Sequence, residues 1–129
     1  MRRLVLIVED ENLTHAIAVA TIITEGFAVL GAGSAEDALD ELAEKRVPDI
    51  VALITDVHLS GHLDGFTLAH RARQMQPAIA LLISSGRPYP DAAQRLPPRA
   101  EFLSKPYAPA DLLGAFRRAI EAVGNSTAG

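Results

Sequence analysis

Short runs of apolar residues alternate along the chain with longer stretches in which apolar residues recur every three or four positions. The short runs are rich in β-branched residues and are bounded by turn-forming residues, which is typical of buried β-strands. The longer stretches have the periodicity of amphipathic helices. Strands are predicted over residues 4–8, 27–30, 50–55, 79–83 and 101–104. Because strands and helices alternate, the pattern predicts an α/β fold with a parallel sheet and crossover helices.

The predicted helices begin and end at residues typical of helix caps. The first runs from Asn12 or Leu13 to Glu25, and Gly26 follows it at the position that helix-terminating glycines occupy. Residues 87–98 carry several prolines, which predicts a fourth helix of two turns at most. The other helices are predicted from the Ser34 N-cap to a point before Pro48, from the Asp64-Gly65 pair to Met75, and from Pro109 to Gly124.

Length and composition describe a single folded domain. A chain of 129 residues with 49% apolar residues is long enough to form one hydrophobic core. The domain is predicted over residues 1–124, followed by a short polar tail at 125–129. The net charge of −4 without a basic stripe argues against nucleic-acid binding, and no apolar stretch reaches the roughly 18 residues of a membrane span. The chain has no cysteine, which excludes disulfides and thiolate sites. We expect a cytoplasmic protein.

Charged side chains follow three of the predicted strands. Glu9-Asp10 follows the first strand, Asp56 follows the third and Lys105 follows the fifth. The carboxyl ends of parallel strands meet at one edge of the sheet, where open α/β sheets place their chemistry. Acids and a lysine at this edge predict a metal-assisted phosphoryl site. Two simpler interpretations stay open: Asp56 could serve as a turn or cap residue, and Glu9-Asp10 could cap the helix that follows.

The type and order of these residues resemble the receiver domain of two-component response regulators, of the stand-alone single-domain type. The resemblance covers about residues 3 to 123. It implies a three-layer flavodoxin-like (CheY-like) fold with five parallel strands in the order 2-1-3-4-5 and about five helices, the fourth short or irregular. The motifs that carry it are Glu9-Asp10, Asp56, Asp64-Gly65, Ser84 and Lys105-Pro106-Tyr107.

The resemblance also implies a role for each residue of the site. Asp56 resembles the phosphoacceptor, a carboxylate that forms an acyl phosphate. Ser84 resembles the switch hydroxyl that contacts a phosphoryl oxygen. Lys105 resembles the lysine that pairs with another phosphoryl oxygen, and with Asp56 before phosphorylation. The implied cofactor is Mg²⁺, an ion that prefers hard oxygen ligands. Its implied ligands are Glu9, Asp10, Asp56 and the backbone carbonyl of His58.

Three positions keep two interpretations each. Ser85 competes with Ser84 for the role of switch hydroxyl. Phe102 lies where the family often carries a switch aromatic, and a plain core residue of the fifth strand fits the position equally well. The side chain of His58 could contact the phosphoryl group or be exposed to solvent.

Two segments depart from the family pattern. The loop at residues 58–63 lacks the usual proline and is one residue longer, which could alter metal geometry or access of a kinase. The proline-rich segment 87–98 replaces the well-formed fourth helix that the family uses as an output face. Tyr89 in this segment and Tyr107 after the fifth strand are expected to be packing or surface residues.

The implied function is that of a response regulator, not of an enzyme acting on other molecules. A sensor histidine kinase or a histidine phosphotransfer protein would phosphorylate Asp56 in a Mg²⁺-dependent reaction. The output would be contact with a downstream protein or phosphorelay, by a monomer or homodimer that binds neither nucleic acid nor membrane. The alternatives are a receiver excised from a hybrid histidine kinase and a docking module that works without phosphorylation. A metal-dependent phosphohydrolase is less favoured, because Asp56-Val57-His58 lacks the second acid of such enzymes.

Overall fold

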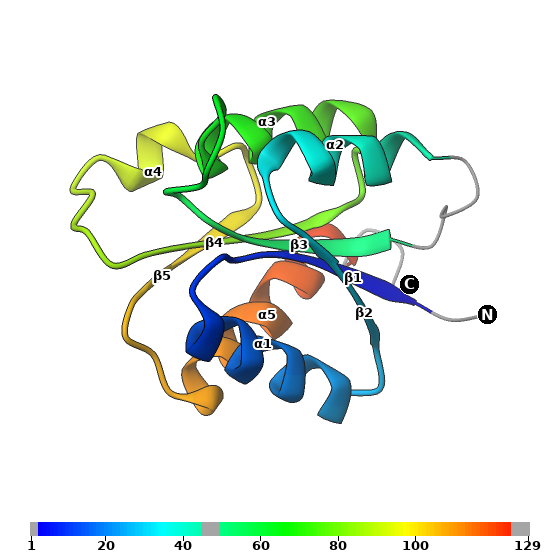
Figure 1. The fold of residues 1–129 in the computed structure, drawn as a ribbon, viewed down its shortest axis with the longest axis vertical. Coiled ribbons are helices and arrows are strands. Elements are labelled where there is room, and N and C mark those ends of the chain that lie inside the picture. The colour runs from blue at the N-terminus through cyan, green and yellow to red at the C-terminus, as the bar shows by residue number, and fades with distance from the viewer. Residues whose placement is uncertain (1–2, 45–49, 125–129) are drawn as a thin grey trace.

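The computed structural model describes residues 3–44 and 50–124 as a parallel sheet between two layers of helices (Figure 1). The five strands lie in the order β2-β1-β3-β4-β5, which confirms the predicted fold. The predicted tail at residues 125–129 lies outside the described residues. The elements are β1 (Leu4–Val8), α1 (Asn12–Thr24), β2 (Ala28–Ala32), α2 (Ala35–Ala43), β3 (Ile50–Asp56), α3 (Gly65–Met75), β4 (Ala80–Ser85), α4 (Ala92–Arg95), β5 (Ala100–Ser104) and α5 (Pro109–Gly124).

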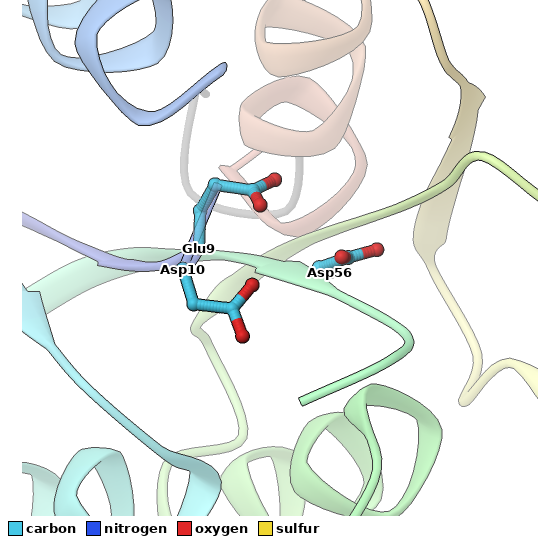
Figure 2. Close-up of side chains that lie close together, drawn as sticks. All are labelled: Glu9, Asp10 and Asp56. Carbon is cyan, nitrogen blue, oxygen red and sulfur yellow. The ribbon is translucent and has the colours of Figure 1, made fainter. Parts of the chain in front are cut away.

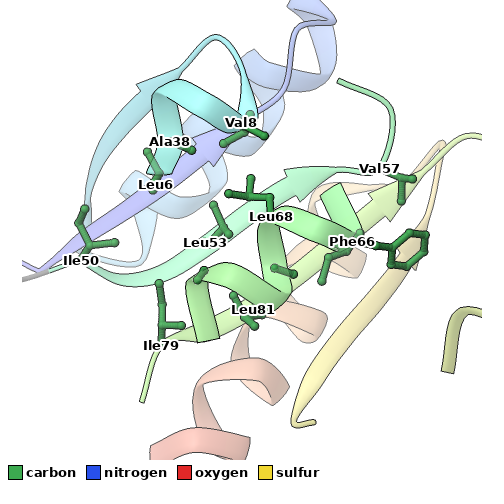
Figure 3. Close-up of a cluster of buried hydrophobic side chains, with 14 residues drawn as sticks. Leu6, Val8, Ala38, Ile50, Leu53, Val57, Phe66, Leu68, Ile79 and Leu81 are labelled. Carbon is green, nitrogen blue, oxygen red and sulfur yellow. The ribbon is translucent and has the colours of Figure 1, made fainter. Parts of the chain in front are cut away.

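Each face of the sheet has its own hydrophobic core, because successive side chains of a strand point to opposite faces. Helices α1 and α5 cover one face, and α2 and α3 cover the other (Figure 1). Figure 3 shows the second core, in which Leu6, Leu53 and Leu81 pack beneath α2 and α3. Alternate residues of the same strands, such as Ile7 and Ile54, pack against α1 and α5. The alternation therefore decides which strand-end side chains share a face.

Four of the five strands differ from their predicted bounds: β3 gains Asp56 and β5 gains Ala100, whereas β2 and β4 change at both ends. β2 begins one residue later than predicted and extends to Ala32, because Gly31 and Ala32 still pair with the end of β1. β4 extends to Ser85, because Asp56 pairs with Ser84 in the register with β3. Both serines are therefore strand residues and are buried.

Helix α1 begins at a cap residue that the sequence pattern did not single out. The side chain of Glu11 accepts hydrogen bonds from the backbone N–H groups of Thr14 at 2.9 Å and Leu13 at 3.2 Å. The interpretation of Glu9-Asp10 as the cap of this helix is therefore wrong. Glu9 instead accepts a hydrogen bond from the backbone N–H of Glu11 at 3.1 Å.

Gly65 opens helix α3 where the helix passes against the end of β3. The side chain of Asp64 caps this helix by accepting a hydrogen bond from the Thr67 N–H at 2.8 Å. The N–H of Gly65 donates to the Val57 carbonyl at 2.8 Å. A Cβ atom at position 65 would lie 2.1 Å from the backbone oxygen of Asp56. The absence of a side chain at Gly65 therefore allows α3 to approach the strand that ends in Asp56.

Helix α4 is a single turn, Ala92–Arg95, which agrees with the prediction of two turns at most. The Lys105–Pro106 peptide bond, between β5 and α5, is cis. Among the helices of the described ranges, none combines the length and apolar character needed to cross a membrane.

Candidate metal and phosphoryl site

Three carboxylates meet at the carboxyl ends of two neighbouring strands. Glu9 and Asp10 follow β1, and Asp56 is the last residue of β3 (Figure 2). The strands are brought side by side by their parallel pairing, in which Val8 is the partner of Thr55. One oxygen atom from each of the three acids lies within 4.8 Å of the others. The predicted cluster therefore forms, with Asp56 buried, Glu9 half-buried and Asp10 exposed.

Lys105 joins this cluster from the loop after β5. Its Nζ atom lies 2.6 Å from an oxygen of Glu9 and 3.2 Å from Oδ2 of Asp56. Burial alone would lower the pKa of Lys105, but the hydrogen bond to Glu9 and the charges of both acids raise it above its usual value. The ammonium group therefore stays charged at neutral pH. The pairing with Glu9 was not predicted, because the resemblance implied pairing with Asp56 alone.

The cluster fits a divalent cation. Oδ1 of Asp56 is buried and has no hydrogen-bond partner among the described residues. A buried carboxylate oxygen without a partner is costly, so a bound cation would stabilise it. Three carboxylates and one ammonium also leave an excess of negative charge. Carboxylate oxygens are the hard ligands that Mg²⁺ prefers.

Ser84 and Ser85 point to opposite faces of the sheet. Ala80 and Leu82 belong to the core beneath α1 and α5, so alternation places Ser84 on the same face. Ser84 also pairs with Asp56 in the strand register. The hydroxyl of Ser85 lies on the other face and accepts a hydrogen bond from the Arg87 N–H at 3.0 Å. The geometry favours Ser84 as the hydroxyl beside Asp56.

Phe102 belongs to a group of rings on the face covered by α3. It is partly buried and stacks against Phe66, with ring centroids 6.3 Å apart and an interplanar angle of 4°. Tyr89 meets both rings edge-on. Phe102 is therefore a packed residue, which agrees with the core interpretation and leaves its role in a switch as a prediction.

The side chain of His58 is half-buried, so the interpretation as a solvent-exposed residue does not describe it fully. Its Nε2 atom shares a hydrogen bond of 2.7 Å with the hydroxyl of Tyr89. Sequence reasoning missed this contact because 31 residues separate the two side chains. No local pattern reports a pairing between a strand-end loop and the segment before α4.

Tyr107 lies half-buried beside the acidic cluster. Burial and the negative charges of Glu9, Asp56 and Glu11 raise the pKa of Tyr107 to about 12. Its phenol is therefore neutral at physiological pH. Tyr107 also lines a small pocket with Leu13, which agrees with the expected packing or surface role.

Replacing Lys105 by methionine is expected to destabilise the metal-free protein by about 1–3 kcal/mol, because it leaves two partly buried carboxylates without their countercharge. Urea unfolding in the presence of a chelator measures this loss. Added Mg²⁺ is expected to recover part of the loss, because cation binding supplies the missing positive charge.

The matched control is Arg117→Met, which removes an exposed ion pair with Glu25. The side chain of Arg117 is 63% exposed, so this change is expected to cost less than about 0.5 kcal/mol. Equal losses in the two variants would contradict the importance assigned to the Lys105 contacts.

A family model described as the response regulator receiver domain matches residues 5–117 of the chain. Among curated proteins, the chain is 32% identical over 105 residues to the sensor kinase CckA of Brucella abortus, a match that covers 80% of this chain and 11% of that protein. It is 36% identical over 75 residues to the two-component response regulator ORR27 of Oryza sativa subsp. japonica, covering 58% of this chain and 12% of that protein. The chain thus spans about a tenth of the length of these relatives.

Solved structures resemble the whole described fold. A response regulator receiver protein from Sinorhizobium medicae superposes with a TM-score of 0.84 at 26% identity, over 94% of this chain and 96% of that one. The receiver domain of the hybrid histidine kinase CckA superposes with a TM-score of 0.71 at 29% identity, over 91% of this chain and 98% of that one.

Proposed function

Because this chain belongs to the response regulator receiver domain family, we propose that it accepts a phosphoryl group on Asp56 from a histidine-bearing partner and then changes its protein contacts. The observation that carries the proposal is the environment of Asp56. Within the described residues, this buried carboxylate has one oxygen without a hydrogen-bond partner, a lysine on the other oxygen, and two further acids beside it.

The reaction needs little covalent work from the protein, since phosphoryl transfer depends on positioning and charge neutralisation. An Asp56 carboxylate oxygen attacks phosphorus, and the bond from phosphorus to the donor's imidazole nitrogen breaks. The product is an acyl phosphate on Asp56, and the donor histidine keeps the electron pair of the broken bond. Lys105 already contacts Asp56 and would pair with a phosphoryl oxygen. Ser84, on the same face, would donate its hydroxyl to another.

Glu9, Asp10, Asp56 and the backbone carbonyl of His58 would hold the metal ion. When bound, Mg²⁺ would offset the negative charge of the acids and of the incoming phosphoryl group. Glu9 and Asp10 lie beside the nucleophilic carboxylate of Asp56 and would share the ion with it. His58 follows Asp56 by two residues, so its backbone lies in the loop that leaves β3 at the site.

Helix α1 exposes apolar side chains on the surface that extends from the site. Leu13 at the start of α1 is 68% exposed and lines a pocket together with Lys105, while Ile23 near the end of α1 is 54% exposed. An apolar groove lies between α1 and the start of α5, lined by residues that include Ala20 and Leu113. We propose that the histidine-bearing helices of a sensor kinase or phosphotransfer protein dock here, in the cytoplasm.

The experiment that tests the proposal is intact mass spectrometry after incubation with acetyl phosphate. We expect one added phosphoryl group in the presence of Mg²⁺ and none after chelation. Beryllofluoride, which imitates a bound phosphoryl group without being hydrolysed, is expected to bind with Mg²⁺ and change the spectrum of the protein. If the protein gains no adduct and also fails to bind beryllofluoride, the proposal is overturned.

Alanine substitution of the two serines tests which hydroxyl contacts the phosphoryl group. Ser84→Ala is expected to change the lifetime of the acyl phosphate, because this side chain shares a face with Asp56. Ser85→Ala is the matched control, since its hydroxyl lies on the other face and is engaged by Arg87. The measurement is the decay of the phosphorylated mass after the donor is removed. A change confined to the Ser85 variant would reverse the assignment.

A further inference from the structure

The loop that leaves the phosphorylation site is tied to the segment before α4 by one polar contact. The ring of His58 and the hydroxyl of Tyr89 share a hydrogen bond of 2.7 Å, and their ring centroids lie 5.8 Å apart. Both side chains are half-buried. His58 is two residues beyond Asp56, so the contact connects the immediate surroundings of the acceptor to a distant part of the chain.

The ring of Tyr89 is held on its other sides. Phe66 meets it edge-on at 5.2 Å between centroids, and Phe102 does so at 6.4 Å. The guanidinium carbon of Arg95, in α4, lies 5.2 Å from the centroid of Tyr89 and 4.3 Å from that of Phe66. The ring of Tyr89 therefore contacts residues of α3, α4 and β5, and its hydroxyl forms a hydrogen bond with the loop after β3.

Arg95 fastens the short helix α4 to α3. Its side chain lies 3.8 Å from a carboxylate oxygen of Asp64, and its backbone carbonyl lies 2.8 Å from Nε2 of His70. A one-turn helix has little stability of its own, since helix nucleation is unfavourable. The position of α4 therefore depends on these tertiary contacts, in which Tyr89 and Arg95 take part together.

We propose that Tyr89 is a positioning residue for the phosphorylation site and acts through His58. Its hydroxyl holds the loop that would supply the His58 carbonyl to Mg²⁺, and its ring carries any movement of that loop to α4. Phe102 has no hydroxyl and cannot make this connection. The inference rests on the proposed role of Asp56, and it assigns to Tyr89 a function beyond packing.

The test compares Tyr89→Phe, His58→Ala and the double variant, with Tyr107→Phe as the control that removes the other phenolic hydroxyl. Tyr89→Phe keeps the ring contacts and removes only the hydrogen bond. In metal-free protein, hydrogen exchange at residues 57–64 and 86–96 is expected to rise about two- to ten-fold, the factor that one hydrogen bond is worth. The rise in hydrogen exchange in the double variant is expected to be no larger than the larger of the two single-variant effects, because both changes break the same contact.

The second measurement concerns the site itself. Tyr89→Phe is expected to weaken Mg²⁺ binding and to change the acyl phosphate lifetime by a similar factor, at a temperature where both proteins are folded. In the wild type, adding Mg²⁺ and beryllofluoride is expected to change hydrogen exchange at residues 86–96. This change is expected to be smaller in Tyr89→Phe and to persist in Tyr107→Phe. A purely structural role of the ring would leave these readouts unchanged.

The inference is overturned if Tyr89→Phe has the same hydrogen exchange, Mg²⁺ affinity and phosphoryl lifetime as the wild type. Additive effects in the double variant would also overturn it, since the two residues would then act separately. If the wild type binds neither Mg²⁺ nor beryllofluoride, the proposed function of Asp56 fails instead. The metal-free comparison of single and double variants would still decide whether Tyr89 acts through His58.

Discussion

Replacing Asp56 by asparagine is expected to abolish phosphorylation while leaving the fold intact. An amide lacks the anionic oxygen that attacks phosphorus, so the acceptor is lost without a change of side-chain size. The variant also removes one of three clustered carboxylates, and Lys105 keeps its contact with Glu9 at 2.6 Å. We therefore expect the free energy of unfolding to stay within about 1 kcal/mol of the wild type.

Intact mass after incubation with acetyl phosphate and Mg²⁺ measures the effect, with denaturant unfolding as the check on stability. Asp40→Asn is the matched control, because Asp40 is an exposed aspartate of α2 away from the strand ends. The control is expected to gain one phosphoryl group as the wild type does. An adduct that persists in Asp56→Asn would place the acceptor at another residue and contradict the assignment.

Replacing Gly65 by alanine is expected to destabilise the protein by about 3 kcal/mol or more, the scale of severe overpacking. The new Cβ atom would lie 2.1 Å from the backbone oxygen of Asp56 and 2.9 Å from the Cα atom of Val57. Both neighbours are backbone atoms of a buried strand end, so neither can rotate away. Helix α3 must shift from β3, which also disturbs the loop that carries His58.

Chemical denaturation measures the loss, and Gly86→Ala is the matched control. A Cβ atom at position 86 would meet no heavy atom within 4 Å, so this change is expected to stay within about 0.5 kcal/mol of the wild type. In Gly65→Ala we also expect weaker Mg²⁺ binding, because the end of β3 moves. A stability equal to that of the control would show that α3 can retreat freely.

The pattern of apolar and polar residues was sufficient to predict the strands, most helix ends and the edge of the sheet that carries the charged residues. These features depend on neighbours in the chain: β-branched runs form strands, Gly26 and Ser34 mark helix ends, and parallel strands present their carboxyl ends together. The convergence of Glu9, Asp10 and Asp56 follows from this geometry. The order of the strands came from the family resemblance, because periodicity does not say which strands are neighbours.

Contacts between distant segments were decided by the tertiary structure. The strand register separates two adjacent serines by directing Ser84 and Ser85 to opposite faces, a choice that neither residue type makes. Glu11, and not Glu9-Asp10, caps α1, because the helix begins at Asn12, directly after Glu11. The pairing of His58 with Tyr89 depends on the packing of the segment before α4 against α3, where Tyr89 contacts Phe66. Local sequence determines which elements form, whereas long-range packing determines which of their side chains meet.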